Sequence, residues 1–128
     1  MTVRAKAPRQ ASSEAQRAVL TKAVVKAAQL LGINQSLVAG TLGVSESTAS
    51  RMYGGKYLLD PDRKDWELAA LLVRVFRSLD SIVAGEDKAR AWLNSMNHAL
   101  GERPINLLPR AEGLIRVLHY LDAARGRI

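Results

Sequence analysis

The stretch "LGVSESTASRMYGGK", residues 42–56, decides the fold of this chain. It combines a glycine that permits a tight turn, a serine placed to cap a helix, and small polar residues where a buried helix would carry bulky apolar ones. A helix, a tight turn and a second helix form the helix-turn-helix motif, whose second helix must fit a DNA groove about 12 Å wide. We therefore predict a helix-turn-helix with Ser45 at the start of its second helix.

The residues before this stretch are spaced as in two helices. Apolar residues recur at intervals of three and four from Ser13 onward, and Gly32 is expected to end this first helix. Asn34 is placed to cap a short second helix that ends at Gly43. Residues 1–12 are basic and poor in large apolar side chains, which predicts a flexible tail.

The residues after this stretch are also helical in their spacing. Asp60 and Pro61 predict an N-cap followed by proline at the first helical position, and a long helix is expected to reach about Val83. Further helical segments follow Gly85, and no strand-like alternation is found. We predict an all-α fold, a helical bundle with a helix-turn-helix followed by a small helical domain. The expected division is a tail (1–12), a helix-turn-helix and dimerisation region (13–84) and a C-terminal domain (85–128).

Length and composition limit the class of protein. The chain has 128 residues, 48% of them hydrophobic, which fits one compact domain or one small domain with an appendage. It contains no cysteine, which excludes disulfides and thiolate metal sites. Its uncharged apolar runs are shorter than the roughly 18 residues that suggest a membrane span. We expect a cytoplasmic protein without a membrane partner.

The positive charge is concentrated in the first half of the chain. The net charge is +7, of which residues 1–64 contribute +6 and residues 65–128 contribute +1. A basic region of this kind favours a polyanion as partner, and we expect operator DNA. Basic residues that serve only solubility are the alternative.

Positions on the predicted helix-turn-helix suggest roles in DNA binding. Residues at the start of the recognition helix are best placed for base edges or nearby phosphates, and flanking residues for the DNA backbone. An ordinary serine-rich helical hairpin remains the alternative. The expected DNA-binding residues are Gln35, Ser45, Ser47, Thr48, Arg51, Tyr53 and Lys56.

The predicted helix after Pro61 carries more apolar positions than one face can hold. We expect the extra face to meet a second copy of the chain, through Trp66, Leu72 and Phe76. Because helix-turn-helix proteins usually bind two DNA half-sites, a homodimer fits this expectation. A deeply buried core helix is the alternative.

Nothing in the sequence indicates catalysis. His98 and His119 are the only histidines, and neither is accompanied by a carboxylate cluster, a nucleophile motif or a glycine-rich phosphate loop. Each is read as a structural or exposed residue. We predict that the protein is not an enzyme and has neither a metal site nor a cofactor.

Two sets of residues resemble a known family. Gln35, Ala39, Gly43, Val44, Ser45, Ser47 and Arg51 resemble the helix-turn-helix of Xre-type regulators. The segment from residue 85 to 126 resembles the toxin-binding domain of the Xre/MbcA/ParS antitoxins. The residues that carry this second resemblance are Trp92, Leu93, Asn97, Leu100, Gly101, Pro104, Leu107, Leu108, Gly113, Val117 and Leu121.

The resemblance implies an antitoxin that represses its own operon and sterically blocks a cognate RES-domain toxin, a class that consumes NAD or modifies proteins with it. It implies a complex with that toxin, as a homodimer or a higher hetero-oligomer. A stand-alone repressor whose C-terminal domain dimerises or senses a ligand is the alternative. The expected toxin-binding residues are the exposed Arg103, Arg110, Arg116 and Tyr120, and the tail residues Arg125, Arg127 and Ile128. A frayed, solvated tail is the alternative for the last three.

Overall fold

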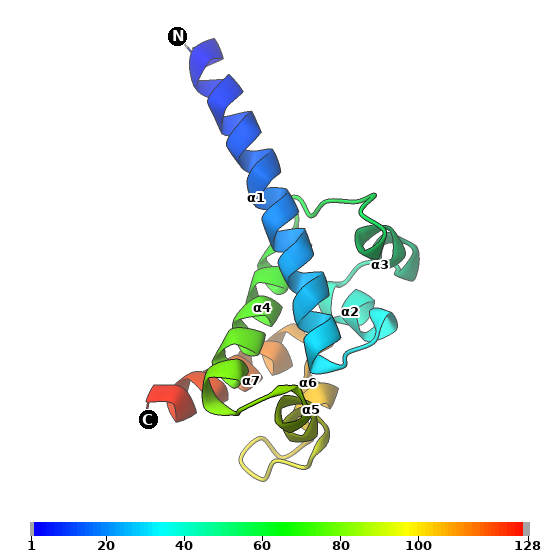
Figure 1. Cartoon of the computed structure of the whole chain (residues 1–128), viewed down its shortest axis with the longest axis vertical. Helices are drawn as coiled ribbons and strands as arrows, with labels where there is room; N and C mark the ends of the chain where they lie inside the picture. Colours follow the sequence, from blue (N-terminus) through cyan, green and yellow to red (C-terminus); the bar gives the residue numbers. More distant parts are fainter. Residues whose placement is uncertain (1, 127–128) are drawn as a thin grey trace.

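The computed structural model describes residues 2–126, with side chains described from Ser13 onward. This part of the chain forms helices and no strand, so the predicted all-α fold is confirmed (Figure 1). An isolated antiparallel bridge joins Asn97 to Glu102 within a loop. The helices are α1 (Thr2–Leu31), α2 (Gln35–Leu42), α3 (Glu46–Tyr53), α4 (Lys64–Ile82), α5 (Glu86–Asn94), α6 (Pro104–Leu107) and α7 (Ala111–Gly126).

Helix α1 is longer than the sequence predicted. It begins at Thr2 rather than at Ser13, so it includes residues 2–12, for which a flexible tail was expected. Residues of these first turns include alanine, arginine, lysine and glutamine, which favour helix. In Figure 1 this part of α1 projects beyond the other helices, so no neighbouring helix supports it.

Helix α4 occupies the centre of the molecule. It packs against α1 on one side and α7 on another, and also contacts α2. This arrangement explains why its sequence is apolar nearly all round: its faces are buried against other parts of the same chain. The prediction that Leu72 meets a second copy is wrong, because Leu72 is fully buried within the chain. Trp66 and Phe76 are half-buried and pack against the core.

A single hydrophobic core links the two regions of the chain. Val24 of α1, Leu72 and Leu79 of α4, and Leu114 and Leu121 of α7 belong to the same cluster of buried side chains. Ser78 of α4 also donates a hydrogen bond of 2.6 Å to the Asp122 carboxylate of α7. The C-terminal helices therefore complete the core that surrounds α4.

Several predicted caps and turns are present. The Asn34 side chain accepts a hydrogen bond from the Leu37 N–H, and the Ser45 side chain accepts one from the Thr48 N–H. Gly43 ends α2 in the left-handed conformation, with φ of 71°. The predicted start of α4 was wrong. The Asp60 carboxylate accepts a hydrogen bond from the Asp62 N–H in a turn, and the helix begins at Lys64, three residues after Pro61.

The junction of α6 and α7 depends on one glycine. A Cβ atom built on Gly113 would lie 2.2 Å from the Leu107 carbonyl oxygen. No side chain fits in that space, so only glycine lets α7 approach the end of α6 so closely. This contact gives a physical reason for glycine at a position that the sequence resemblance had singled out.

Candidate functional site

Helices α2 and α3 form the predicted helix-turn-helix. Val38, Ala39 and Leu42 of α2 and Ala49 and Met52 of α3 are buried in or against the core. The turn between the helices passes through Gly43, whose positive φ avoids a steric penalty that other residues would carry. The inward faces of both helices are therefore fixed, which leaves the outer face of α3 to solvent.

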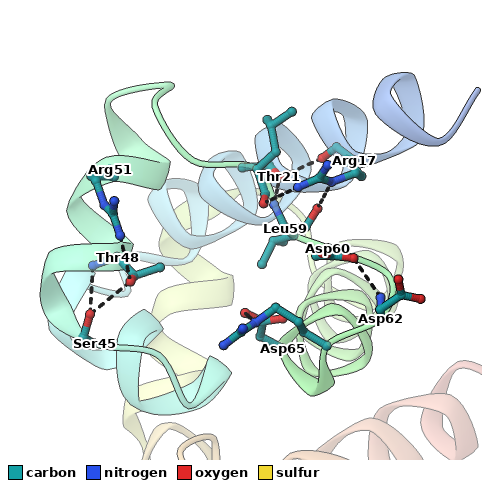
Figure 2. A network of polar contacts seen from close by, with 11 residues as sticks. Arg17, Thr21, Ser45, Thr48, Arg51, Leu59, Asp60, Asp62 and Asp65 are labelled. Atoms are coloured by element: carbon teal, nitrogen blue, oxygen red, sulfur yellow. Dashed lines mark hydrogen bonds and ion pairs between the residues drawn. The ribbon is translucent and has the colours of Figure 1, made fainter. Parts of the chain in front are cut away.

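The outer face of α3 carries small polar groups and one arginine. Ser45, Ser47 and Arg51 are exposed, and Thr48 is half-exposed. Ser45 also donates to the Thr48 hydroxyl at 3.0 Å, and the Arg51 guanidinium donates to the same hydroxyl at 3.4 Å (Figure 2). These contacts join the three side chains from the N-cap along nearly two turns of the helix. Four of the predicted DNA-binding residues thus lie together on one exposed face.

Arg51 has a second contact that fixes its direction. Its guanidinium carbon lies 5.7 Å from the centre of the Tyr57 ring, within the range of a cation–π interaction. Tyr57 lies in the segment that leads from α3 to α4. Arg51 is therefore held by both the helix and the segment after it, while its guanidinium remains accessible to an anion.

The remaining predicted DNA-binding residues differ in their surroundings. Gln35 is the half-buried first residue of α2, and Lys56 is exposed just after α3. Tyr53 does not fit the role, because its hydroxyl oxygen is buried and has no hydrogen-bond partner. Burial also raises the pKa of Tyr53, which keeps the phenol neutral. A group turned inward in this way is not placed to contact the DNA backbone.

Helix α1 anchors the segment that follows α3. The Arg17 side chain donates to the carbonyl oxygens of Leu59 at 2.7 Å and Leu58 at 3.2 Å (Figure 2). The Leu59 N–H donates to the Thr21 hydroxyl at 3.0 Å. The segment after α3 is therefore tied to α1 by both main-chain polar groups of Leu59.

The predicted toxin-binding residues that the structure describes lie on α7 and in the turns before α6 and α7. Arg103 precedes α6, Arg110 precedes α7, and both are exposed. Arg110 forms an ion pair of 3.6 Å with Glu112, and Arg125 forms one of 3.6 Å with Asp122. Arg127 and Ile128 lie outside the described residues.

Two of the predicted toxin-binding residues have structural contacts. The Arg116 guanidinium donates to the Leu100 carbonyl oxygen at 2.8 Å and so holds the loop before α6. Tyr120 is half-buried and stacks on Trp92, with ring centres 6.0 Å apart. Both residues connect α7 to the α5–α6 region, so their replacement would also alter the shape of this surface.

Sequence reasoning missed two exposed apolar side chains in the same C-terminal region. Met96 is 57% exposed in the loop after α5, and Ile115 is 39% exposed on α7. Methionine is enriched in protein–protein interfaces, whereas singly exposed apolar side chains are otherwise ordinary on protein surfaces. Nothing in the spacing distinguishes them from core residues, because their exposure depends on how α7 packs.

The loop before α6 carries a perturbed carboxylate. Hydrogen bonds from the Arg103 N–H, the larger effect, and from the Asn106 side-chain amide hold the pKa of Glu102 below its usual range.

Within the described residues, no group of three or more histidine or acidic side chains could hold a metal ion. None of the helices there has the length and hydropathy needed to cross a bilayer.

Comparisons with known proteins agree with this geometry. The family model for the antitoxin Xre-like helix-turn-helix domain matches residues 10–74. The model for the antitoxin Xre/MbcA/ParS C-terminal toxin-binding domain matches residues 78–127. The predicted resemblance is thereby confirmed. No protein with curated annotation matches the chain significantly.

A solved structure is similar over most of the chain. A chain in the crystal structure of the M. tuberculosis MbcT–MbcA toxin–antitoxin complex has 26% identity to this one and a TM-score of 0.65. The alignment covers 86% of this chain and 96% of that chain. The similarity therefore extends over both matched domains and their arrangement.

Proposed function

The chain belongs to the family of antitoxins with an Xre-like helix-turn-helix domain and a C-terminal toxin-binding domain, and we propose that its toxin is of the NAD-consuming RES type. We propose further that the C-terminal surface covers the toxin's substrate cleft and that the helix-turn-helix represses the antitoxin's own operon. Both matched regions are binding domains rather than catalytic ones. The resemblance to Xre/MbcA/ParS antitoxins supports the choice of toxin.

The exposed face of α3 carries the proposal of DNA binding. It combines Ser45, Ser47 and Arg51 on a helix whose inner residues Ala49 and Met52 are buried. Small side chains let the helix approach a groove, and the arginine is able to donate two hydrogen bonds to guanine. Lys56, exposed at the end of the helix, adds a charge for a phosphate.

Exposed arginines on the C-terminal helices support the proposed toxin contact. Arg103 and Arg110 are exposed in turns of the domain that also carries the exposed Met96 and Ile115. Arginine and large apolar side chains are enriched in protein interfaces. We propose that the C-terminal residues Arg125, Arg127 and Ile128 extend this contact into an anionic or nucleotide-binding cleft of the toxin.

We also propose that the protein binds its operator as a dimer. Trp66 and Phe76 of α4 remain half-buried in the single chain, which leaves part of each ring available to a second copy. Two copies would present two recognition helices to half-sites spaced along the DNA. Light scattering of the free protein and of its operator complex tests this stoichiometry.

Operator binding is tested with DNA from upstream of the operon. Arg51→Ala should weaken binding by about 1–3 kcal/mol, and Lys56→Ala should reduce the salt dependence by roughly one charge. Lys88→Ala on α5 is the matched control, since Lys88 is exposed and lies on a different helix. Equal binding by all three variants would exclude α3 as the recognition helix.

Toxin neutralisation is tested by growth rescue with the adjacent open reading frame. Point variants are preferable to a truncation, because removal of residues 85–128 would strip α7 from α4 and expose the core. Arg103→Ala combined with Arg110→Ala should lose rescue, whereas Arg77→Ala on α4 and Arg51→Ala should retain it. A harmless neighbouring gene would instead favour a stand-alone repressor.

A further inference from the structure

A cavity lies between α1 and the end of the recognition helix. Its volume is about 540 Å³, within the range of roughly 300–1,000 Å³ typical of small-molecule sites. Val25, Met52 and Leu58 supply apolar lining, and Gly55 and Tyr57 come from the segment that closes α3. Hydrogen bonds from the Arg17 side chain to the Leu58 and Leu59 carbonyl oxygens, and from the Leu59 N–H to the Thr21 hydroxyl, hold this segment against α1.

Tyr53 contributes its ring, and not its hydroxyl, to the cavity surface. The Tyr53 hydroxyl oxygen is buried without a hydrogen bond to any described residue. Because that oxygen has no surface open to solvent, a ligand in the cavity does not reach it. The Thr21 hydroxyl, also in the lining, already donates to the Arg17 carbonyl oxygen and accepts from the Leu59 N–H.

Two lysines give the cavity a positive charge. Lys22 and Lys26 are one helical turn apart on α1, and both line the cavity. Neither forms an ion pair with a residue that the structure describes, and no acidic side chain is among the lining residues. An anionic group would find two uncompensated ammonium groups here, next to apolar walls.

From these contacts we propose that the cavity binds an amphipathic organic anion. The ligand is an apolar chain or ring that carries a carboxylate. The carboxylate pairs with Lys22 and Lys26, while the apolar part lies against Val25 and Met52. This site is separate from both the exposed face of α3 and the C-terminal arginines.

The cavity shares one residue, Tyr57, with the surroundings of the proposed DNA-binding face. Tyr57 lines the cavity and also lies under the Arg51 guanidinium. A ligand that displaces the Tyr57 ring therefore changes the support of Arg51. The site is independent of the toxin surface, so its occupancy is measurable without either macromolecular partner.

The test is titration of the full-length protein with decanoate, followed by calorimetry and by backbone amide NMR. We expect saturable binding at one site per chain, with shifts at Val25, Met52 and Tyr57. Lys22→Gln combined with Lys26→Gln should weaken decanoate binding about tenfold or more, as expected on loss of hydrogen bonds to a charged group. Tyr53→Phe, which removes a hydroxyl that the cavity does not expose, should leave decanoate affinity unchanged.

The controls separate the site from general apolar or electrostatic binding. Lys64→Gln combined with Lys88→Gln removes two exposed lysines outside the cavity and should leave decanoate affinity unchanged. Decanol, which has the same chain without charge, should bind at least about tenfold more weakly. Equal binding of decanol, or equal affinity in the cavity variant and its control, would overturn the proposal.

DNA is the other polyanion that these lysines are able to meet. If decanoate does not bind, and the Lys22 and Lys26 replacements lower operator affinity and its salt dependence, the lysines are phosphate contacts and the proposal is wrong. Decanoate binding that survives in Arg51→Ala would uphold the cavity site even if operator binding is absent. Failure of the DNA proposal and failure of this one are thus distinguished.

Discussion

The Thr21 hydroxyl and the Leu59 main chain are joined across 38 residues of sequence. The Leu59 N–H donates to Thr21 Oγ1 at 3.0 Å, and that hydroxyl in turn donates to the Arg17 carbonyl oxygen at 2.7 Å. Both Thr21 and Leu59 are buried. This link holds the segment after the recognition helix against α1, so the position of α3 depends on it.

Thr21→Val tests that link. The variant keeps the shape of the side chain but leaves the buried Leu59 N–H without an acceptor, which should lower the free energy of unfolding by about 1–3 kcal/mol. Urea unfolding followed by circular dichroism measures the change.

Thr41→Val is the matched control for this variant. Thr41 is also buried in the helix-turn-helix, but its hydroxyl has no hydrogen-bond partner. Its removal should leave stability unchanged or raise it by up to about 1 kcal/mol. Equal losses in the two variants would mean that the Thr21 hydrogen bond does not hold the segment.

Gly113→Ala should destabilise the protein by about 1–3 kcal/mol or more, because its Cβ would overlap the Leu107 carbonyl oxygen. Gly40→Ala, also within a helix, has only Pro109 Cβ nearby at 3.9 Å and should be neutral or stabilising by up to about 1 kcal/mol. Thermal unfolding of both variants checks the contrast, and a stable Gly113→Ala would show that α6 is able to move away from α7.

Arg90→Ala should destabilise the C-terminal end of α1. The Arg90 side chain lies over Gly32 and donates to the carbonyl oxygens of Leu30 at 3.1 Å and Gln29 at 3.0 Å. Loss of these bonds should cost about 1–2 kcal/mol, given that Arg90 is partly exposed. Hydrogen exchange at the end of α1 reports the change, and Lys88→Ala should show none.

Glu102 should make the loop before α6 sensitive to acid. Its pKa is held below 4.5 by hydrogen bonds that favour the carboxylate, so its contribution to stability is present above that pH. The contribution should disappear as the pH falls from 4.5 through the lowered pKa. Carbon-detected NMR titration measures this pKa directly, and a value at or above 4.5 would contradict the hydrogen-bonded loop.

A stability comparison with Glu102→Gln provides an independent check. Glutamine retains an acceptor oxygen but does not titrate in this range. The difference in unfolding free energy between the two proteins should therefore become smaller as the pH falls from 4.5 through the lowered pKa of Glu102. A difference that does not vary with pH would mean that the carboxylate charge does not stabilise the loop.

Local signals in the sequence were sufficient for the helix-turn-helix. Asn34, Gly43 and Ser45 act within their own helix ends, through side-chain caps or a positive φ, and each occurs where it was predicted. The prediction failed at Asp60 and Pro61 because a turn and an N-cap use the same residue types. The correct start of α4 is set by its packing in the core.

The sequence by itself determined the all-α class, the family resemblance and the polar outer face of α3, because capping, spacing and small side chains act over a few residues. Only the tertiary structure decided that Leu72 is enclosed within the chain and that the Tyr53 hydroxyl turns inward. It also brought Lys22 and Lys26 beside the end of α3. Burial and cavity shape depend on how helices distant in sequence pack, and that packing is not encoded in any one segment.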